Sequence, residues 1–98
     1  RALAPAPRLL LLDEPAANLD PKWQLRLMHL LRELVESRGI AVVAAMHDLD
    51  LAARFADRML MMKDGAVAAD GHPGALLDSP HVRDVFGVVR SGSGWELA

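Results

Sequence analysis

The chain has 98 residues, of which 52% are hydrophobic, and it carries a formal net charge of −2 with no cysteine. A chain this apolar is not a disordered segment, and its length suits one modest domain with a core. The near-neutral charge argues against nucleic-acid binding through bulk positive charge, and the lack of cysteine excludes disulfides and thiolate metal sites.

A run of four leucines near the start of the chain predicts a buried strand over about residues 8–12. The run fits neither the period of two of a half-buried strand nor the period of 3.6 of a surface helix. A short apolar run closed by turn residues is typical of a strand covered on both faces in a parallel sheet. Residues 1–4 are predicted to be the last turn of a preceding helix, which Pro5 and Pro7 end.

Two carboxylates, Asp13 and Glu14, stand where this predicted strand ends, and Pro15 then stops the hydrogen-bond ladder because it has no N–H. In open α/β sheets, ligands bind beyond the carboxyl ends of the strands. Successive residues on an extended chain point opposite ways, so one carboxylate could face a cation and its neighbour a water, as phosphate hydrolysis requires. The alternative interpretation is a solvated strand end without a chemical role.

A helix is predicted after Asp20, which suits the N-cap, with Pro21 at the first helical position and Gly39 at the C-terminal stop. One face of this helix is apolar and is expected to pack against the sheet. That face comprises Leu27, Met28, Leu31, Leu34 and Val35.

A second apolar run, residues 40–46, predicts another buried strand and is well short of the roughly 18 residues of a membrane span. Strand, helix and strand form a βαβ unit, whose right-handed crossover makes the two strands parallel. Parallel strands end at the same edge of a sheet, so His47 is expected beside Asp13 and Glu14. The alternative for His47 is a hydrogen-bonded structural histidine.

The second half of the chain is predicted to contain short elements. Asp48 suits the cap of a helix over residues 49–56, and residues 58–70 predict a hairpin around Asp64-Gly65. Short helices are expected over residues 75–78 and 80–86, followed by a flexible link over residues 91–94 and a last segment, 95–98. Three methionines are predicted to fill the core and three histidines to lie on the surface: Met59, Met61 and Met62, and His29, His72 and His81.

In this order, the motifs resemble the ATP-binding subunits of ABC transporters. Residues 9–15 resemble the Walker B strand with its catalytic glutamate, and residues 17–20 resemble the D-loop. Residues 46–49 resemble the switch-histidine segment, and residues 1–4 the end of the helix that follows the signature motif. The resemblance implies an α/β fold that is part of a P-loop NTPase domain, with a parallel βαβ core followed by a β-hairpin and short C-terminal helices.

The resemblance also implies roles for individual residues and an ATPase activity that uses ATP and Mg²⁺. The aspartate matching Asp13 holds Mg²⁺, usually through water, and the glutamate matching Glu14 polarises the attacking water. The histidine matching His47 binds the γ-phosphate, and the aspartate matching Asp20 contacts the second subunit across the bound ATP. Asp20 can serve as an N-cap and in that contact at once.

Residues 47–58, the hairpin and the tail from Gly71 are similar to importers of iron–siderophore, haem or vitamin B12, although Ala75 replaces an acidic residue common there. The partners this implies are a second ATP-binding subunit, transmembrane permease subunits and a substrate-binding protein, without nucleic acid. The implied location is peripheral, at the cytoplasmic face of the inner membrane.

A phosphate-cradling loop of the form Gly-x-x-x-x-Gly-Lys-Ser/Thr is absent from the 98 residues, and so is a signature motif. With the missing initial methionine, this predicts that residues 1–98 are the C-terminal part of a single ABC-type nucleotide-binding domain, inactive alone. Two alternatives remain at this point: a head-domain fragment of an ABC-type DNA-repair ATPase, and a non-catalytic remnant that acts in dimerisation or regulation.

Overall fold

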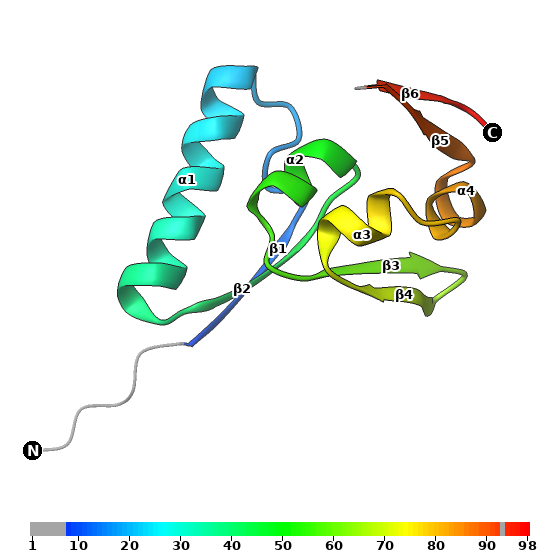
Figure 1. Ribbon diagram of the computed structural model, residues 1–98. Coiled ribbons are helices and arrows are strands. Elements are labelled where there is room, and N and C mark those ends of the chain that lie inside the picture. Colours follow the sequence, from blue (N-terminus) through cyan, green and yellow to red (C-terminus); the bar gives the residue numbers. More distant parts are fainter. Residues whose placement is uncertain (1–7, 93) are drawn as a thin grey trace, which may run out of the picture. The chain divides into compact units, whose positions relative to one another are not determined.

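The computed structural model describes residues 8–92 and 94–98 and divides into two compact units, which meet in sequence between His47 and Asp48. The first unit contains β1 (Leu9–Asp13), α1 (Pro21–Arg38) and β2 (Ala41–Ala45) (Figure 1). The second contains α2 (Leu49–Phe55), β3 (Met59–Lys63), β4 (Ala66–Gly71), α3 (Pro73–Leu77), α4 (His81–Phe86), β5 (Val88–Ser91) and β6 (Gly94–Leu97). The helical turn predicted over residues 1–4 lies outside the described residues.

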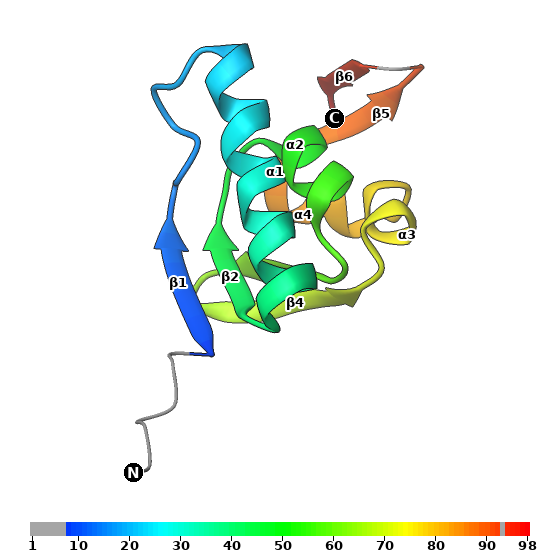
Figure 2. The same ribbon diagram turned by 90° about the vertical axis from the view of Figure 1, so that its left-hand side faces the viewer.

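The first unit is the predicted βαβ unit. Strands β1 and β2 are parallel, with a register that runs from Leu9 opposite Ala41 to Asp13 opposite Ala45. Figure 2 shows the two arrows side by side and pointing the same way. The α/β fold class and the parallel core are therefore confirmed, and both strands end at the same edge.

Helix α1 begins and ends where its capping residues predict. The Trp23 backbone N–H donates to Asp20 Oδ1 at 3.1 Å, and Pro21 occupies the first turn. Gly39 adopts φ 64° beyond the last turn, a left-handed conformation in which glycine has no Cβ to clash, and its N–H donates to Val35 O at 3.2 Å. From the predicted apolar face, Met28 and Leu31 are buried, and the other members are half-buried.

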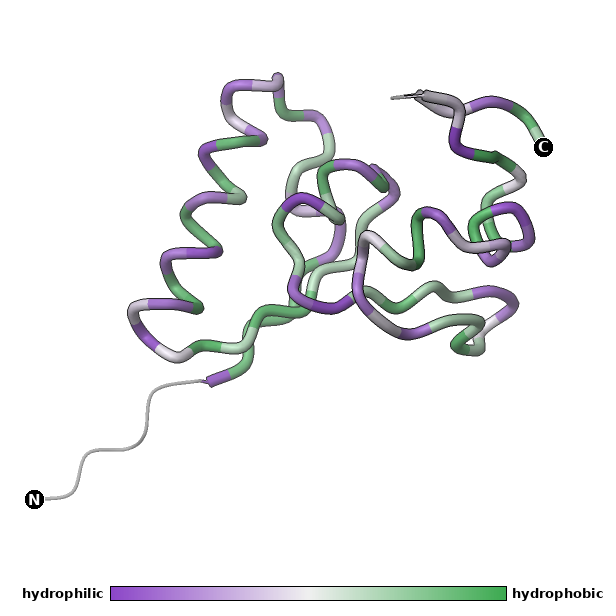
Figure 3. Tube along the Cα trace, viewed as in Figure 1, coloured by the Kyte–Doolittle hydropathy of each residue, from purple (hydrophilic) through white to green (hydrophobic). Residues whose placement is uncertain are grey.

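The prediction that both strands are buried on both faces is wrong for this chain. Leu9 and Val43 are each 54% exposed and Leu11 is 69% exposed. Among the described residues the sheet has only these two strands, and α1 is the one helix of this unit, so within the unit α1 can cover only one face of the sheet. Figure 3 shows the strongly hydrophobic colouring along β1 and β2 that a covered sheet would normally hide.

The second unit is built on the predicted hairpin of β3 and β4. Asp64 and Gly65 have φ of 52° and 78°, the pair of positive values that a two-residue type I′ turn requires. The buried cluster beside the hairpin joins β3 to the short helices α3 and α4. It comprises Met59, Met61, Leu76, Leu77 and Val82.

The prediction that Met62 fills the core is wrong, because Met62 is 52% exposed. Successive residues of a strand point to opposite faces, and β3 buries Met59 and Met61, so Met62 faces away from the core. The predicted flexible link over residues 91–94 is also wrong, since Ser91 pairs with Gly94 in the hairpin of β5 and β6.

The short helices and surface histidines agree with prediction, with one addition. Helices α3 and α4 cover most of the predicted residues 75–78 and 80–86, and all three histidines are exposed. His72 also caps α3, because its Nδ1 accepts from the Gly74 N–H at 3.1 Å. Within residues 8–92 and 94–98, no helix combines the length and the hydropathy needed to cross a membrane.

Candidate active site

His47 and Glu14 meet at the carboxyl-terminal edge of the β1–β2 pair. The Nε2 atom of His47 lies 3.0 Å from Oε1 of Glu14, within hydrogen-bond distance. The register brings them together, because Glu14 and His47 follow the strand ends at Asp13 and Ala45, which are opposite each other. The predicted convergence of the acidic pair and the histidine is therefore confirmed.

The two side chains of this pair differ in how much water they meet. The Glu14 side chain is 34% exposed, whereas the His47 imidazole is 88% exposed. The imidazole is thus free to meet a ligand from solvent, while the carboxylate is held closer to the protein. This asymmetry suits a fixed base beside a group that contacts an incoming ligand.

Glu14 has an uncommon backbone conformation, with φ of 50°. A left-handed conformation costs a non-glycine residue on the order of 1 kcal/mol and persists only where neighbouring contacts impose it. Here the Glu14 N–H donates to Ala45 O at 2.8 Å, and the Ala17 N–H donates to Glu14 O at 3.1 Å. The sheet and the following turn therefore fix this residue from both sides.

Asp13 remains within the strand, on the exposed face that also carries Leu9 and Leu11. Glu14 has already left the extended conformation, so strand alternation, from which we predicted opposite orientations, does not determine where its side chain lies. Asp13 presents its carboxylate to water at the strand end, one residue from the Glu14–His47 pair.

The turn between Glu14 and α1 is attached to the helix at two points. The Gln24 side-chain amide donates to the carbonyl of Ala16 at 3.2 Å, and Ala16 is buried. Asp20 closes the turn as the N-cap of α1, which confirms its structural role. We did not predict the contribution of Gln24, because no local sequence signal marks an amide that reaches back to a carbonyl eight residues earlier.

The donor set at this edge fits Mg²⁺ held together with a nucleotide. Within the described part of the chain, no group of three or more His, Cys, Asp or Glu side chains could hold a metal ion by itself. Mg²⁺ keeps several waters and is commonly bound through one or two carboxylates plus substrate phosphates. Asp13 supplies one exposed carboxylate of this kind.

Comparisons with known proteins identify relatives of this chain. A family model described as "AAA domain, putative AbiEii toxin, Type IV TA system" matches residues 1–53. The chain is 42% identical over 87 residues to the hemin import ATP-binding protein HmuV of Bordetella avium, covering 87% of this chain and 33% of that protein. It is 48% identical over 86 residues to the cobalamin import ATP-binding protein BtuD of Halobacterium salinarum, covering 88% of this chain and 22% of that protein.

A solved structure extends the similarity to three dimensions. CbiO1 of Clostridium perfringens, part of the ABC transporter complex cbiONQ, matches with a TM-score of 0.69 and 33% identity, covering 82% of this chain and 34% of that one. The fold therefore corresponds to part of a P-loop NTPase fold. The alternative of a DNA-repair ATPase receives no support from these relatives.

The present chain spans about a third or less of the length of the relatives it matches, which agrees with the prediction that it corresponds to part of a family member. The family model matches more than half of the chain. The chain therefore belongs to the AAA-domain family of that model and, as its relatives show, to the ABC transporter ATP-binding proteins.

Proposed function

We propose that this chain is the C-terminal part of the ATP-hydrolysing subunit of an ABC transporter, with Asp13, Glu14 and His47 at its catalytic edge. The observation that carries the proposal is the 3.0 Å approach of His47 Nε2 to Glu14 Oε1 at the end of two parallel strands. A carboxylate and an imidazole at this edge are suited to phosphoryl transfer to water, in which catalysis depends on positioning and charge stabilisation.

In this proposal Glu14 is the general base of the Walker B segment, and His47 is the switch histidine. The Glu14 carboxylate polarises the attacking water and accepts its proton, and the fixed left-handed backbone supports this role because it limits where the carboxylate can move. The exposed His47 imidazole binds the γ-phosphate of ATP. Binding would draw Nε2 away from Glu14 and leave that carboxylate available to water.

Asp13 would hold Mg²⁺, mostly through water, together with the phosphates of ATP. The bound ion would neutralise negative charge on those phosphates. Asp13 is suited to this part because its carboxylate lies on the exposed face at the end of β1. The phosphate-cradling loop and signature motif, absent from these 98 residues, would come from the rest of the same nucleotide-binding domain.

Asp20 would contact a second ATP-binding subunit through the D-loop, residues 17–20. The contacts of this loop support a rigid structure, because the Asp20 carboxylate is fixed as an N-cap, with Oδ1 at 3.1 Å from the Trp23 backbone nitrogen. The loop also contains Asn18 with φ of 66°, a conformation that asparagine tolerates better than most residues. A turn defined at both ends presents the same surface to a partner each time.

The transported substrate is proposed from the relatives. HmuV and BtuD are named as import proteins for hemin and cobalamin, and CbiO1 is part of a transporter complex. We therefore propose an importer of iron–siderophore, haem or vitamin B12, with transmembrane permease subunits and a substrate-binding protein as partners. The subunit would act as a peripheral protein at the cytoplasmic face of the membrane.

The test is to replace glutamate by glutamine at the position of Glu14 in an intact homologous subunit. ATP binding is expected to persist and turnover to fall by about 10²–10⁴-fold, because the water loses its base. The matched control is the same change at the position of Glu33, on the exposed face of α1, which should leave turnover unchanged. Equal turnover of the Glu14→Gln variant and the parent at saturating ATP would show that Glu14 is not the general base.

The chain by itself is expected to bind no ATP, because it lacks the loop that supplies most phosphate contacts. Titration of the 98-residue chain with a fluorescent ATP analogue and Mg²⁺ should give no saturable signal. Micromolar binding would show that Asp13, Glu14 and His47 hold a nucleotide without that loop, and would contradict the proposed division of the domain.

A further inference from the structure

The hairpin of β5 and β6 is a weak element by itself. Each strand has four residues, and within the described chain the two strands pair only with each other. An isolated two-stranded hairpin is at best marginally stable in water. Val88 and Trp95 pack against the hydrophobic cluster of the second unit, and the hairpin also makes polar contacts with α2.

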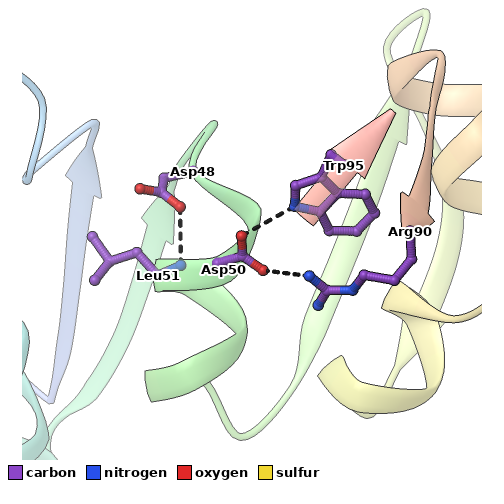
Figure 4. Close-up of polar contacts among 5 residues, drawn as sticks. All are labelled: Asp48, Asp50, Leu51, Arg90 and Trp95. Carbon is purple, nitrogen blue, oxygen red and sulfur yellow. Dashed lines mark hydrogen bonds and ion pairs between the residues drawn. The ribbon is translucent and has the colours of Figure 1, made fainter. Parts of the chain in front are cut away.

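One carboxylate supplies these contacts from the first turn of α2. Asp50 Oδ1 accepts from the Arg90 guanidinium at 3.0 Å, and Asp50 Oδ2 accepts from the Trp95 indole N–H at 3.0 Å (Figure 4). Arg90 and Trp95 are direct partners across the hairpin, and the guanidinium carbon lies 4.3 Å from the indole ring centroid. Asp50 thereby joins both strands of the hairpin to the helix.

We propose that Asp50, Arg90 and Trp95 form a clasp that closes the C-terminal hairpin over α2 and can open while the rest of the second unit stays folded. This inference goes beyond the proposed ATPase function and does not depend on it. When closed, the clasp keeps Trp95 against the hydrophobic cluster. When open, it exposes the side of the cluster that Val88 and Trp95 cover.

The clasp is suited to opening because its ionic part remains in contact with water. The Asp50 side chain is 54% exposed and the Arg90 side chain is 29% exposed. Salt screens an exposed ion pair, and the Debye length falls from about 10 Å at 0.1 M to about 3 Å at 1 M. The packing of Met61 and Val82, which are almost fully buried, does not depend on ionic contacts.

The test follows Trp95 as the only tryptophan, in a Trp23→Phe background, since the chain has two tryptophans. Asp50→Ala is expected to raise the equilibrium constant for hairpin opening about tenfold, because two hydrogen bonds to a charged group are lost. Acrylamide quenching of Trp95 fluorescence measures this increase, because the open hairpin exposes the indole ring. Raising the salt to about 1 M should increase quenching of the parent and have little effect on Asp50→Ala.

The matched control is Asp64→Asn, which removes the same charge from the same unit. Asp64 lies in the β3–β4 turn with φ of 52°, which asparagine also adopts, so Trp95 quenching should match the background. Amide hydrogen exchange at Met61 separates hairpin opening from general unfolding. Protection there should persist in Asp50→Ala. Unchanged Trp95 quenching, or loss of Met61 protection together with that of the hairpin, would overturn the clasp.

Discussion

The two units of the chain differ in where their apolar side chains lie. The unit that ends at His47 contains the candidate site, yet it leaves Leu9, Leu11 and Val43 more than half exposed. The unit that begins at Asp48 contains none of the proposed catalytic residues, yet it has a contiguous buried cluster of five side chains around Met61 and Val82.

Site geometry and core packing have separate origins here. Glu14 and His47 meet because backbone hydrogen bonds set the register of two parallel strands. That register does not require both faces of the sheet to be covered. The second unit, in contrast, has short elements that depend on burial, since its helices contain only five to seven residues each.

The largest expected effect comes from removing a side chain of the buried cluster. Met61→Ala should lower the free energy of unfolding of the second unit by about 2–4 kcal/mol, because it leaves a cavity. The neighbouring Met62→Ala is the matched control, since Met62 is 52% exposed and should change stability by less than about 0.5 kcal/mol. Urea unfolding followed by amide exchange in β3 measures both. Equal losses would contradict the assignment of Met61 to the core and of Met62 to the surface.

A polar substitution on the exposed face of the β1–β2 sheet is expected to have a smaller effect on stability and a clear effect on self-association. The unpaired edges and exposed leucines predict that the chain associates with itself. Leu11→Thr should reduce light scattering at high concentration and change the stability by no more than about 0.5 kcal/mol. Leu10→Thr is the control. Leu10 lies on the half-buried face, so this substitution should instead lower the stability of the chain. A parent chain that is monodisperse at high concentration would refute the association.

The smallest expected effect concerns an exposed ion pair of the second unit. The Arg58 guanidinium hydrogen-bonds to Asp70, with Nε to Oδ1 at 2.6 Å, and this bond lowers the pKa of the Asp70 carboxyl below its usual value. Folded protein therefore binds this proton less readily than unfolded protein. The stabilisation is present above the usual pKa of aspartate and disappears as the pH falls through the lowered pKa.

The measurement compares the urea midpoint of the parent with that of Asp70→Asn across acid pH. The difference between them should shrink as the pH falls, and Arg58→Ala should remove the same pH dependence because it removes the cause of the pKa shift. A difference that stays constant through this range would show that the ion pair contributes nothing that depends on the Asp70 proton.

Much of the local structure could be predicted from short patterns. Asp20 with Pro21 defined the start of α1, Gly39 its end, and Asp64-Gly65 the tight turn, because each of these residues satisfies a backbone requirement by itself. The signal for the last hairpin was also present, since Gly-Ser between two apolar stretches is typical of a two-residue turn. A glycine–serine stretch is also typical of a flexible link, and the pairing of Ser91 with Gly94 shows that this second interpretation is wrong.

The order of apolar runs in the sequence is enough to predict that two strands joined by a helix are parallel, and hence that Asp13, Glu14 and His47 lie at one edge. The left-handed backbone of Glu14, its direct approach to His47, and the exposure of Leu11 follow from the folded chain and not from any short pattern. The same is true of the contacts by which Asp50 joins residues 40 and 45 positions away. Chain direction follows from local connectivity, whereas contacts and burial depend on which surfaces other parts of the chain can reach.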